Sequence, residues 1–420
     1  GCRFTWAQVW ERTRRLAAVL TDEFGVGRGD RVAVLAHNTT NCLEVQFACA
    51  ALGAIMVPAN WRLTLRELDY IWSDCKPSVI VHGSEMDDVA AELSIRHGSS
   101  PRLRWGEADH GPALSYEEAL AGASPLSPSQ HVEHDEVLLV MYTSGTSGNP
   151  KGAMLTHEMV FWNVVNQLEF FGLRPGMVNL IFLPLFHIAG LNLFANPAVH
   201  FGGCNVVMPA FDASEVLSVL QSREIGITHL VGVPANYLIM SQEPGFVDAT
   251  FPTLECVSVG GSPTPTSIID TWLKKGVALQ QVFGMTETSP TVMALACADA
   301  ATRIGSAGQQ ALHNDVRIVG EDGENVAPGE TGELWVRGPN VTPGYWNNPE
   351  ATSTAITDAW LHTGDAARCD EDGFYYIVDR WKDMYISGGE NVYPSEVENV
   401  LYEIDAIAEV AVVGIPDERW

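Results

Sequence analysis

A run of apolar residues that opens into a loop of small polar residues constrains this chain more than any other stretch. The run Val137–Tyr142 is typical of a buried strand, and the loop after it is dense in Gly, Ser and Thr and ends at Lys151. Such a loop presents many backbone N–H groups and hydroxyls with little steric bulk, and the lysine adds a positive charge. The stretch therefore predicts a site for polyphosphate oxygens, and the alternative is an ordinary flexible surface loop.

This loop is not a Walker phosphate-binding loop. With Gly145 as the first glycine, Pro150 and Gly152 stand where the Walker motif requires Gly and Ser or Thr around the lysine. The amphipathic pattern of a helix resumes at Thr156.

Apolar strands alternate with amphipathic helices along most of the chain. Two capping boxes, Thr5–Gln8 and Thr64–Glu67, mark helix starts. Continuous apolar strands separated by such helices are typical of a parallel sheet covered on both faces. A polar connection with little periodicity, residues 97–135, interrupts the pattern. The predicted strands are 32–36, 55–58, 78–81, 137–142, 205–208, 228–231, 256–259 and 279–283, and the predicted helices include Cys42–Leu52, Ala213–Arg223 and Pro265–Lys275.

Beyond about residue 300 the pattern changes to short strands joined by tight turns. Strands are expected at 316–319, 333–336 and 372–378. This part of the sequence predicts a smaller antiparallel or barrel-like subdomain.

Charge and cysteine content narrow the classes of function. The formal net charge of −28 opposes binding to nucleic acid or to an anionic membrane, because both would repel the chain. The eight cysteines are scattered without C-x-x-C or metal-site spacing, so buried free thiols in a reducing compartment are expected. The most apolar stretch, residues 180–199, is broken by two prolines, His187 and two asparagines. With no signal peptide and no integral membrane segment, the predicted location is cytoplasmic.

Three polar, glycine-containing loops leave predicted strands at their carboxyl ends: Thr143–Gly152, Gly260–Thr264 and Gly284–Thr288. Ligands of parallel sheets gather at this edge. In the third loop Glu287 could ligate Mg²⁺ through oxygen, with phosphates and water completing the shell. An N-cap or ion-pair role for Glu287 is the alternative.

These loops, in this order, closely resemble the adenylate-forming superfamily, which includes acyl-CoA synthetases and luciferase. The resemblance covers essentially the whole chain and extends to residues 183–190, 332–338, 345–346, 360–365 and 378–394. It implies an α/β fold whose large N-terminal domain, residues 1–379, combines helix-layered parallel sheets with a distorted β-barrel at about 300–379. A hinge at 380–382 and the start of a truncated α+β C-terminal domain at 383–420 would follow.

The resemblance also implies a two-step reaction that uses ATP, Mg²⁺ and coenzyme A. A carboxylate attacks the α-phosphate of MgATP to give an acyl-adenylate and pyrophosphate, and a thiol then attacks the mixed anhydride. Asp365 would accept hydrogen bonds from both ribose hydroxyls because a carboxylate is acceptor-only, and Arg380 would approach the ribose and phosphate. Thr143 and Glu287 would hold Mg²⁺ against the charge of the departing pyrophosphate.

The resemblance assigns further nucleotide contacts by position. The β- and γ-phosphates would lie against Thr143, Ser144, Gly145, Thr146, Ser147, Gly148 and Lys151. The adenine slot would contain Gly260, Gly261, Ser262 and Phe283, with Thr286 at the α-phosphate and Pro263, Gly284 and Met285 as further nucleotide contacts.

His187 occupies the position that gates the pocket between acyl and thiol sites in this family. A lone histidine is otherwise more often structural. Amino-acid-activating relatives carry an aspartate here that pairs with the substrate ammonium, so an α-amino acid is disfavoured. The residues expected to contact the acyl group are His187, Ile188, Asn192, Val231, Gly260, Gly284, Met285 and Thr291, of which Asn192 and Thr291 could serve a phenol or simply bond to backbone.

Lys382 occupies the hinge position of the family, and the segment after it would enter the site to help form the thiol tunnel. That segment is Ser387, Gly388, Gly389 and Glu390, for which an ordinary turn is the alternative. Only Asp383–Trp420 follows the hinge, and the family's late catalytic lysine is missing, so impaired adenylation is expected. The residues expected to carry the chemistry are Thr143, Lys151, His187, Glu287, Arg380 and Lys382.

The leading interpretation is an acyl-CoA synthetase, an acid–thiol ligase of the kind found in fatty acid metabolism. The expected pocket stretches are mostly apolar and offer no obvious Arg or Lys for a second carboxylate. The substrate would therefore be a hydrophobic carboxylic acid, either a fatty acid or an arylpropenoate. Transfer of the acyl group to a carrier protein and an inactive nucleotide-binding fragment are the alternatives, and a homodimer is left open.

Overall fold

The computed structural model describes residues 2–106, 113–127, 131–143, 149–387, 390–401, 404, 407 and 410–415. The chain divides into two compact units. The first unit contains Gly1–Phe161, Asn179–Phe211 and Thr342–Thr352, and the second contains Trp162–Val178, Asp212–Val341 and Ser353–Trp420. In the described part of the chain, no helix is both long and apolar enough to cross a membrane.

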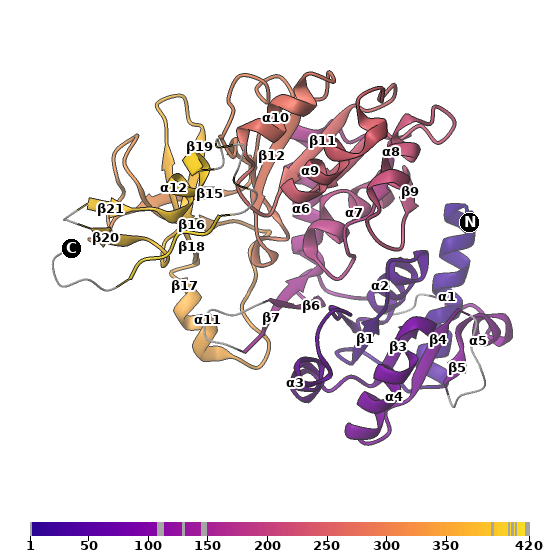
Figure 1. Ribbon diagram of the computed structural model, residues 1–420. Coiled ribbons are helices and arrows are strands. Elements are labelled where there is room, and N and C mark those ends of the chain that lie inside the picture. The colour runs from indigo at the N-terminus through magenta and orange to yellow at the C-terminus, as the bar shows by residue number, and fades with distance from the viewer. Residues whose placement is uncertain are drawn as a thin grey trace. The chain divides into compact units, whose positions relative to one another are not determined.

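A seven-stranded sheet forms the centre of the first unit, with the strand order β5-β4-β3-β1-β2-β6-β7 (Figure 1). All neighbours from β5 to β6 are parallel, and β7 is antiparallel to β6. The strands are β1 (Arg31–Leu35), β2 (Ile55–Pro58), β3 (Val79–Gly83), β4 (Arg102–Trp105), β5 (Leu114–Ser115), β6 (Val137–Thr143) and β7 (Lys151–Thr156). The helices include α1 (Trp6–Asp22), α2 (Thr40–Leu52), α3 (Leu65–Cys75), α4 (Asp87–Arg96) and α5 (Tyr116–Gly122).

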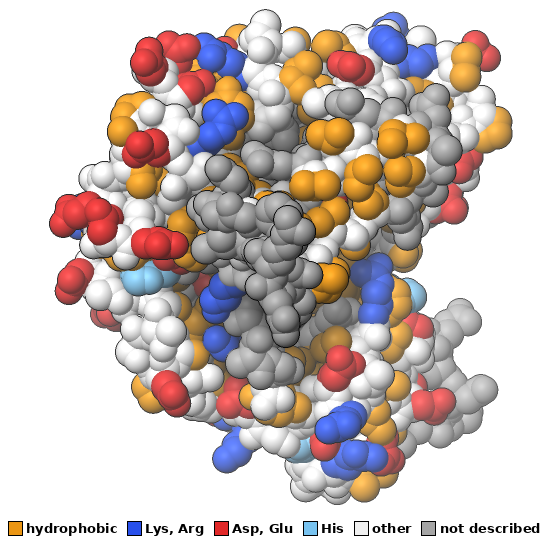
Figure 2. All heavy atoms as spheres, turned by 60° about the vertical axis from the view of Figure 1, so that its left-hand side comes forward, with side chains coloured by type: hydrophobic (Ala, Val, Ile, Leu, Met, Phe, Trp, Pro, Cys, Tyr) orange, Lys and Arg blue, Asp and Glu red, His pale blue; other side chains and the backbone are white. Residues whose placement is uncertain are grey.

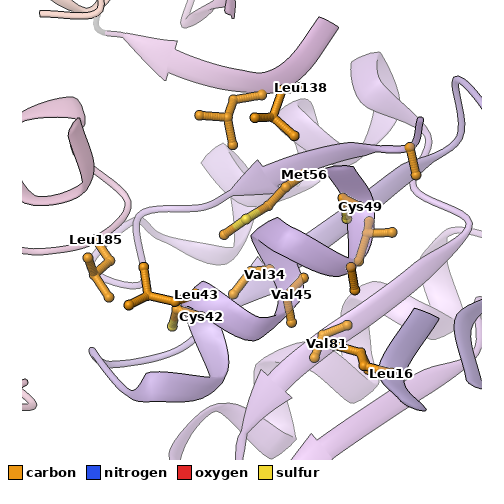
Figure 3. Packing of buried hydrophobic residues seen from close by; sticks show 14 of the residues in the cluster. Leu16, Val34, Cys42, Leu43, Val45, Cys49, Met56, Val81, Leu138 and Leu185 are labelled. Atoms are coloured by element: carbon orange, nitrogen blue, oxygen red, sulfur yellow. The ribbon is translucent and has the colours of Figure 1, made fainter. Parts of the chain in front are cut away.

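Helices cover both faces of this sheet, because alternate residues of its apolar strands point to opposite sides. Val34 of β1 belongs to a buried cluster with Leu16 of α1 and Val45 of α2 (Figure 3). Its neighbour Leu35 belongs to a second cluster with Leu68 of α3 and Leu93 of α4. The two predicted capping boxes are confirmed at the starts of α1 and α3.

The polar connection at 97–135, for which the sequence predicts no helix or strand, contains β4, β5 and α5. The strand β4 is fully buried even though two of its four residues are arginines. Asp87 neutralises both, lying 3.0 Å from Arg102 Nη1 and 3.2 Å from Arg104 Nη1. Buried arginines break the apolar pattern that marks a strand, which explains the error.

The first unit also holds β9 (Cys204–Val207), α7 (Ala195–His200) and all but the first residue of β8 (Val178–Ile181). A π-helical turn, Ala189–Leu193, precedes α7. Such turns are rare and often occur at functional sites.

The second unit contains the strands β14-β13-β12-β11-β10 in adjacent order. β10, β11 and β12 are parallel, and β13 and β14 continue the row in antiparallel fashion. Their bounds are β10 (His229–Gly232), β11 (Cys256–Gly260), β12 (Leu279–Gly284), β13 (Thr291–Ala294) and β14 (Gln309–Gln310). The accompanying helices are most of α6 (His157–Phe171), with α8 (Ala213–Gln221), α9 (Pro234–Gln242) and α10 (Thr266–Leu273).

A separate antiparallel sheet follows in the second unit, with the order β15-β16-β18-β17 and with β19 paired to β18. Its strands are β15 (Asp315–Val319), β16 (Gly332–Arg337), β17 (Ile356–Thr357), β18 (Trp360–Cys369) and β19 (Tyr375–Arg380). The remaining strands and α-helices are β20 (Tyr385–Ser387), β21 (Glu390–Val392), α12 (Pro394–Leu401) and α11 (Pro349–Ala355), whose first four residues belong to the first unit. The predicted change to antiparallel structure beyond residue 300 is confirmed.

The eight cysteines are all free, but the expectation that they are buried holds only in part. Cys42 is buried, and this burial raises the pKa of its thiol to about 11. The exposed residues Cys2, Cys204 and Cys297 contradict the expectation, since an apolar neighbour in sequence does not fix where a side chain points. Acidic side chains are spread over the face in Figure 2, in keeping with the net charge of −28.

Candidate nucleotide site

The second unit contains a cavity of about 530 Å³ at the ends of β11 and β12. Four segments line it: the end of β11 with the chain after it, the end of β12, Gly305 with Ala307, and the paired strands β18 and β19. The predicted residues that it brings together are Gly260, Gly261, Ser262, Pro263, Phe283, Gly284, Met285, Asp365 and Arg380. Residues far apart in the sequence thus line one cavity.

The parallel pairing of β11 with β12 brings their following loops to one edge (Figure 1). Gly261, after β11, has φ +85°, a conformation that side-chain-bearing residues rarely adopt. At Gly284, at the end of β12, a Cβ atom would lie 1.6 Å from the Pro290 carbonyl oxygen. Glycine is therefore required at both positions for the chain to follow this path.

Asp365 and Arg380 face each other across β18 and β19. Arg380 Nη1 donates to Asp365 Oδ1 at 2.7 Å, and the side chains of Arg380 and Asp365 are 52% and 8% exposed. Burial raises the pKa of Asp365, and the positive charge of Arg380 opposes that rise. The cavity wall therefore carries a carboxylate with hydrogen-bond acceptors beside an accessible cation.

The cavity also contains polar residues that sequence reasoning missed. Asp379 and Gln281 line it, as does Thr264. Asp379 is 8% exposed and accepts a hydrogen bond from the Arg380 amide at 2.7 Å. Asp379 precedes Arg380 in the segment 378–394 that resembles the family, and this position could have indicated a role in the site. Only the register of β18 with β19 shows that Asp379 reaches the cavity.

Glu287 lies in a short 3-10 turn, Thr286–Thr288, directly after the β12 loop, and is only 4% exposed. The side-chain amide of Asn340 supports this turn, because its Nδ2 donates to the carbonyl oxygens of Thr288 at 2.6 Å and Thr291 at 3.0 Å. Among the residues that the structure describes, no three His, Cys, Asp or Glu side chains gather to hold a metal. A cation bound by Glu287 would thus need most of its oxygens from a ligand and water.

In the first unit, Thr143 and Lys151 lie opposite each other at the ends of β6 and β7. The hydroxyl of Thr143 donates to the Lys151 carbonyl at 3.5 Å. The predicted polyphosphate residues Ser144, Gly145, Thr146, Ser147 and Gly148 lie outside the described residues. The loop therefore joins the two strands of a hairpin. The sequence pattern did not predict the second of these strands, β7.

Lys151 is held over an aromatic ring. Its Nζ lies 5.3 Å from the centroid of Tyr345, within cation–π range. A bridge between Ala153 and Tyr345 and a hydrogen bond of 2.7 Å from the Trp346 amide to the Gly152 carbonyl fix the backbone beside β7.

His187, also in the first unit, has an exposed imidazole that packs against Phe186 at a centroid distance of 4.6 Å. Partial desolvation and the charge of Arg62 lower its pKa, which favours the neutral ring at pH 7. Ile188 is buried in the core. Asn192 is also buried and accepts a hydrogen bond from Asn196.

The other described predicted residues of the second unit are not among those that line the cavity. Val231 is a buried residue of β10. Thr291 is fully buried, and its hydroxyl accepts a hydrogen bond from Gln167 Nε2 at 3.0 Å, so this oxygen already has a protein partner. Lys382 is exposed just after β19. Ser387 ends β20 and Glu390 begins β21, while Gly388 and Gly389 lie outside the described residues.

Comparisons with known proteins identify the family to which the chain is similar. The family described as AMP-binding enzyme matches residues 1–346. A feruloyl-CoA synthase of Amycolatopsis sp is 42% identical over 420 residues, which is 100% of this chain and 82% of that protein. A Mycobacterium tuberculosis fatty acyl CoA synthetase superposes with a TM-score of 0.84 at 35% identity, covering 100% of this chain and 81% of the other. The ATP-bound structure of MatB from Rhodopseudomonas palustris gives a TM-score of 0.87 at 30% identity, covering 100% of this chain and 82% of the other.

Proposed function

The chain belongs to the AMP-binding enzyme family, and from that membership we propose that it is an ATP-dependent acid–thiol ligase. It joins a hydrophobic carboxylic acid to coenzyme A through an acyl-adenylate. The observation that carries the proposal is the cavity in which the Gly260 and Gly284 loops face Asp365 and Arg380. Small residues on one wall leave room for a flat base, and a buried carboxylate on the other suits two ribose hydroxyls.

In the first step, a substrate carboxylate oxygen forms a bond to the α-phosphorus of ATP, and pyrophosphate leaves. Arg380 lies beside Asp365 and offsets negative charge near the sugar and α-phosphate. We assign the outgoing phosphates to Lys151 and Thr143, as the family resemblance implies. In the second step, the CoA sulfur attacks the acyl carbonyl, and AMP leaves.

Magnesium fits this site as a partner of the nucleotide. Glu287 offers hard carboxylate oxygens, which Mg²⁺ prefers, and the second ligand that the family resemblance implies is the Thr143 hydroxyl. Because Mg²⁺ usually keeps several waters and binds substrate phosphates, one or two protein ligands are sufficient. When bound, it would neutralise charge on the departing pyrophosphate.

We expect an aryl or arylpropenoate acid as the substrate. The 42% identity to a feruloyl-CoA synthase supports this class, and the similarity to a fatty acyl CoA synthetase keeps a fatty acid as the second candidate. His187 argues against an α-amino acid, because an imidazole, which its lowered pKa keeps neutral, carries no negative charge to form an ion pair with an ammonium group.

Thioester formation from a panel of acids tests the proposal. With MgATP and CoA, ferulate and coumarate should form CoA thioesters faster than decanoate does. Decanoate as the better substrate would shift the assignment to a fatty acid. Pyrophosphate release without any CoA thioester would point to another thiol acceptor, and no release with any acid would contradict the proposal.

Tyr345 offers a test of the phosphate role that we propose for Lys151. Replacing Tyr345 with Leu removes the ring under the Lys151 ammonium, and we expect the KM for ATP to rise about fivefold. Tyr345→Phe is the matched control, since it keeps the ring and should stay within about twofold of wild type. Equal effects of the two substitutions would assign the loss to the phenol hydroxyl instead. The measurement is the KM for ATP at saturating acid and CoA.

A further inference from the structure

Asp365 stands in an irregular part of β18. Glu333 of β16 pairs with Ala366, and Trp335 pairs with His362, so four residue steps of β18 face two of β16. The extra length is taken up by a bulge that contains Thr363, Gly364 and Asp365. Bulges beside active sites redirect a side chain, and this one directs Asp365 to the cavity wall.

A bulge interrupts the ladder, so its backbone groups need other partners. The Gly364 amide donates to Glu333 Oε1 at 3.2 Å, and the Asp365 amide donates to Thr363 Oγ1 at 3.1 Å. The Thr363 hydroxyl donates to the Leu334 carbonyl at 2.8 Å. The Gly364 carbonyl accepts from the Trp381 amide at 2.8 Å. Side chains thus replace much of the missing ladder.

Glu333 is itself fixed from the other side. Its second oxygen, Oε2, accepts the indole N–H of Trp335 at 2.8 Å. Trp335 in turn stacks on His362, with ring centroids 4.0 Å apart and planes 10° from parallel. The carboxylate therefore bridges two N–H donors, one on a rigid aromatic pair and one in the bulge.

We propose that Glu333 is a positioning residue for nucleotide binding: by holding the Gly364 amide, its carboxylate fixes the bulge that aims Asp365 at the ribose. The inference rests on the proposed function, because it takes Asp365 to be the ribose contact. Only a carboxylate suits this position. Glutamine has one acceptor and one donor group, so its NH₂ would face either the indole N–H or the Gly364 N–H.

The test compares AMP affinity by calorimetry in the wild type, Glu333→Gln, Trp335→Phe and the double variant. We expect Glu333→Gln to weaken AMP binding about tenfold, because a hydrogen bond to a charged group is lost. Trp335→Phe alone should have little effect. In the double variant the indole N–H is absent, so the NH₂ group of the new glutamine no longer has to face another donor. Its amide oxygen can then accept from the Gly364 N–H, and AMP affinity should recover toward that of Trp335→Phe. Glu321→Gln, an exposed carboxylate of the same subdomain, is the control for charge.

A pH profile of AMP binding supplies a readout that a purely structural role would not move. Asp365 is faced by Arg380 on β19 and Glu333 on β16, and Asp379 lies beside Arg380. The charge of Glu333 helps to raise the pKa of Asp365, so Glu333→Gln should lower that pKa. The acid limb of binding, where Asp365 becomes protonated, should therefore move to lower pH.

The outcomes separate this inference from the function on which it rests. A wild type that does not bind AMP would overturn the proposed function and this inference with it. A wild type that binds, together with Glu333→Gln at wild-type affinity and an unmoved acid limb, would overturn the inference alone. If Glu333→Gln fails to fold, Glu333→Leu in the Trp335→Phe background decides, because leucine leaves the Gly364 N–H without its acceptor: AMP affinity about tenfold below that of Trp335→Phe supports the proposal, and affinity equal to that of Trp335→Phe contradicts it.

Discussion

Asp365→Ala is expected to remove measurable binding of ATP and AMP. The wild-type carboxylate is buried beside Arg380 and would accept both ribose hydroxyls, so its loss removes two charge-assisted hydrogen bonds. At about 1.5–3 kcal/mol each, these bonds correspond to an affinity loss of roughly two to four orders of magnitude. Calorimetric titration with AMP measures it directly.

A matched control lies in the same antiparallel sheet. Asp315 also pairs with an arginine across two strands, with 2.7 Å between its Oδ2 and Arg337 Nη2. Both side chains are about half exposed or more, and neither lines the cavity. Asp315→Ala should therefore leave AMP affinity unchanged. Equal losses in the two variants would show that an aspartate–arginine pair matters only for the sheet.

Glu287→Gln should slow adenylation by about 10²–10³-fold while leaving metal-free AMP binding intact. The substitution keeps the size of this buried side chain but removes its negative charge. We propose that this charge binds Mg²⁺. Single-turnover formation of acyl-AMP gives the rate, and a magnesium titration should show a higher requirement for the ion.

This result would separate Glu287 from Asp365, whose loss should appear in AMP binding without metal. Glu215→Gln, an exposed carboxylate in the first turn of α8, is the control and should retain the wild-type rate. A Glu287→Gln variant with wild-type rate and magnesium dependence would remove Glu287 from the site.

The general fold could be predicted from the sequence because the spacing of hydrophobic residues along a strand or helix reflects which of its faces are buried. The strands at 32–36 and 55–58 are continuous apolar runs, as expected for strands covered on both faces. From that arrangement it follows that the loops after β11 and β12 share an edge, and both line one cavity.

Other features depend on contacts that no local pattern reveals. β4 carries two arginines in a buried strand, and only the distant Asp87 makes that possible. Asp379 reaches the cavity because of the register of β18 with β19, and Glu333 reaches the Gly364 amide because of the register of β18 with β16. Register and bulges are set by pairing across the sheet, so the sequence of one strand does not contain them.

The most direct test of the account is acid-dependent exchange of labelled pyrophosphate into ATP in the absence of CoA. Exchange requires that the first step form an acyl-adenylate reversibly, and it bypasses the thiol entirely. The account predicts exchange that appears when ferulate or a related hydrophobic acid is added and that is lost in Asp365→Ala. Absence of exchange with every acid, or ATP cleavage to ADP and phosphate instead, would contradict it.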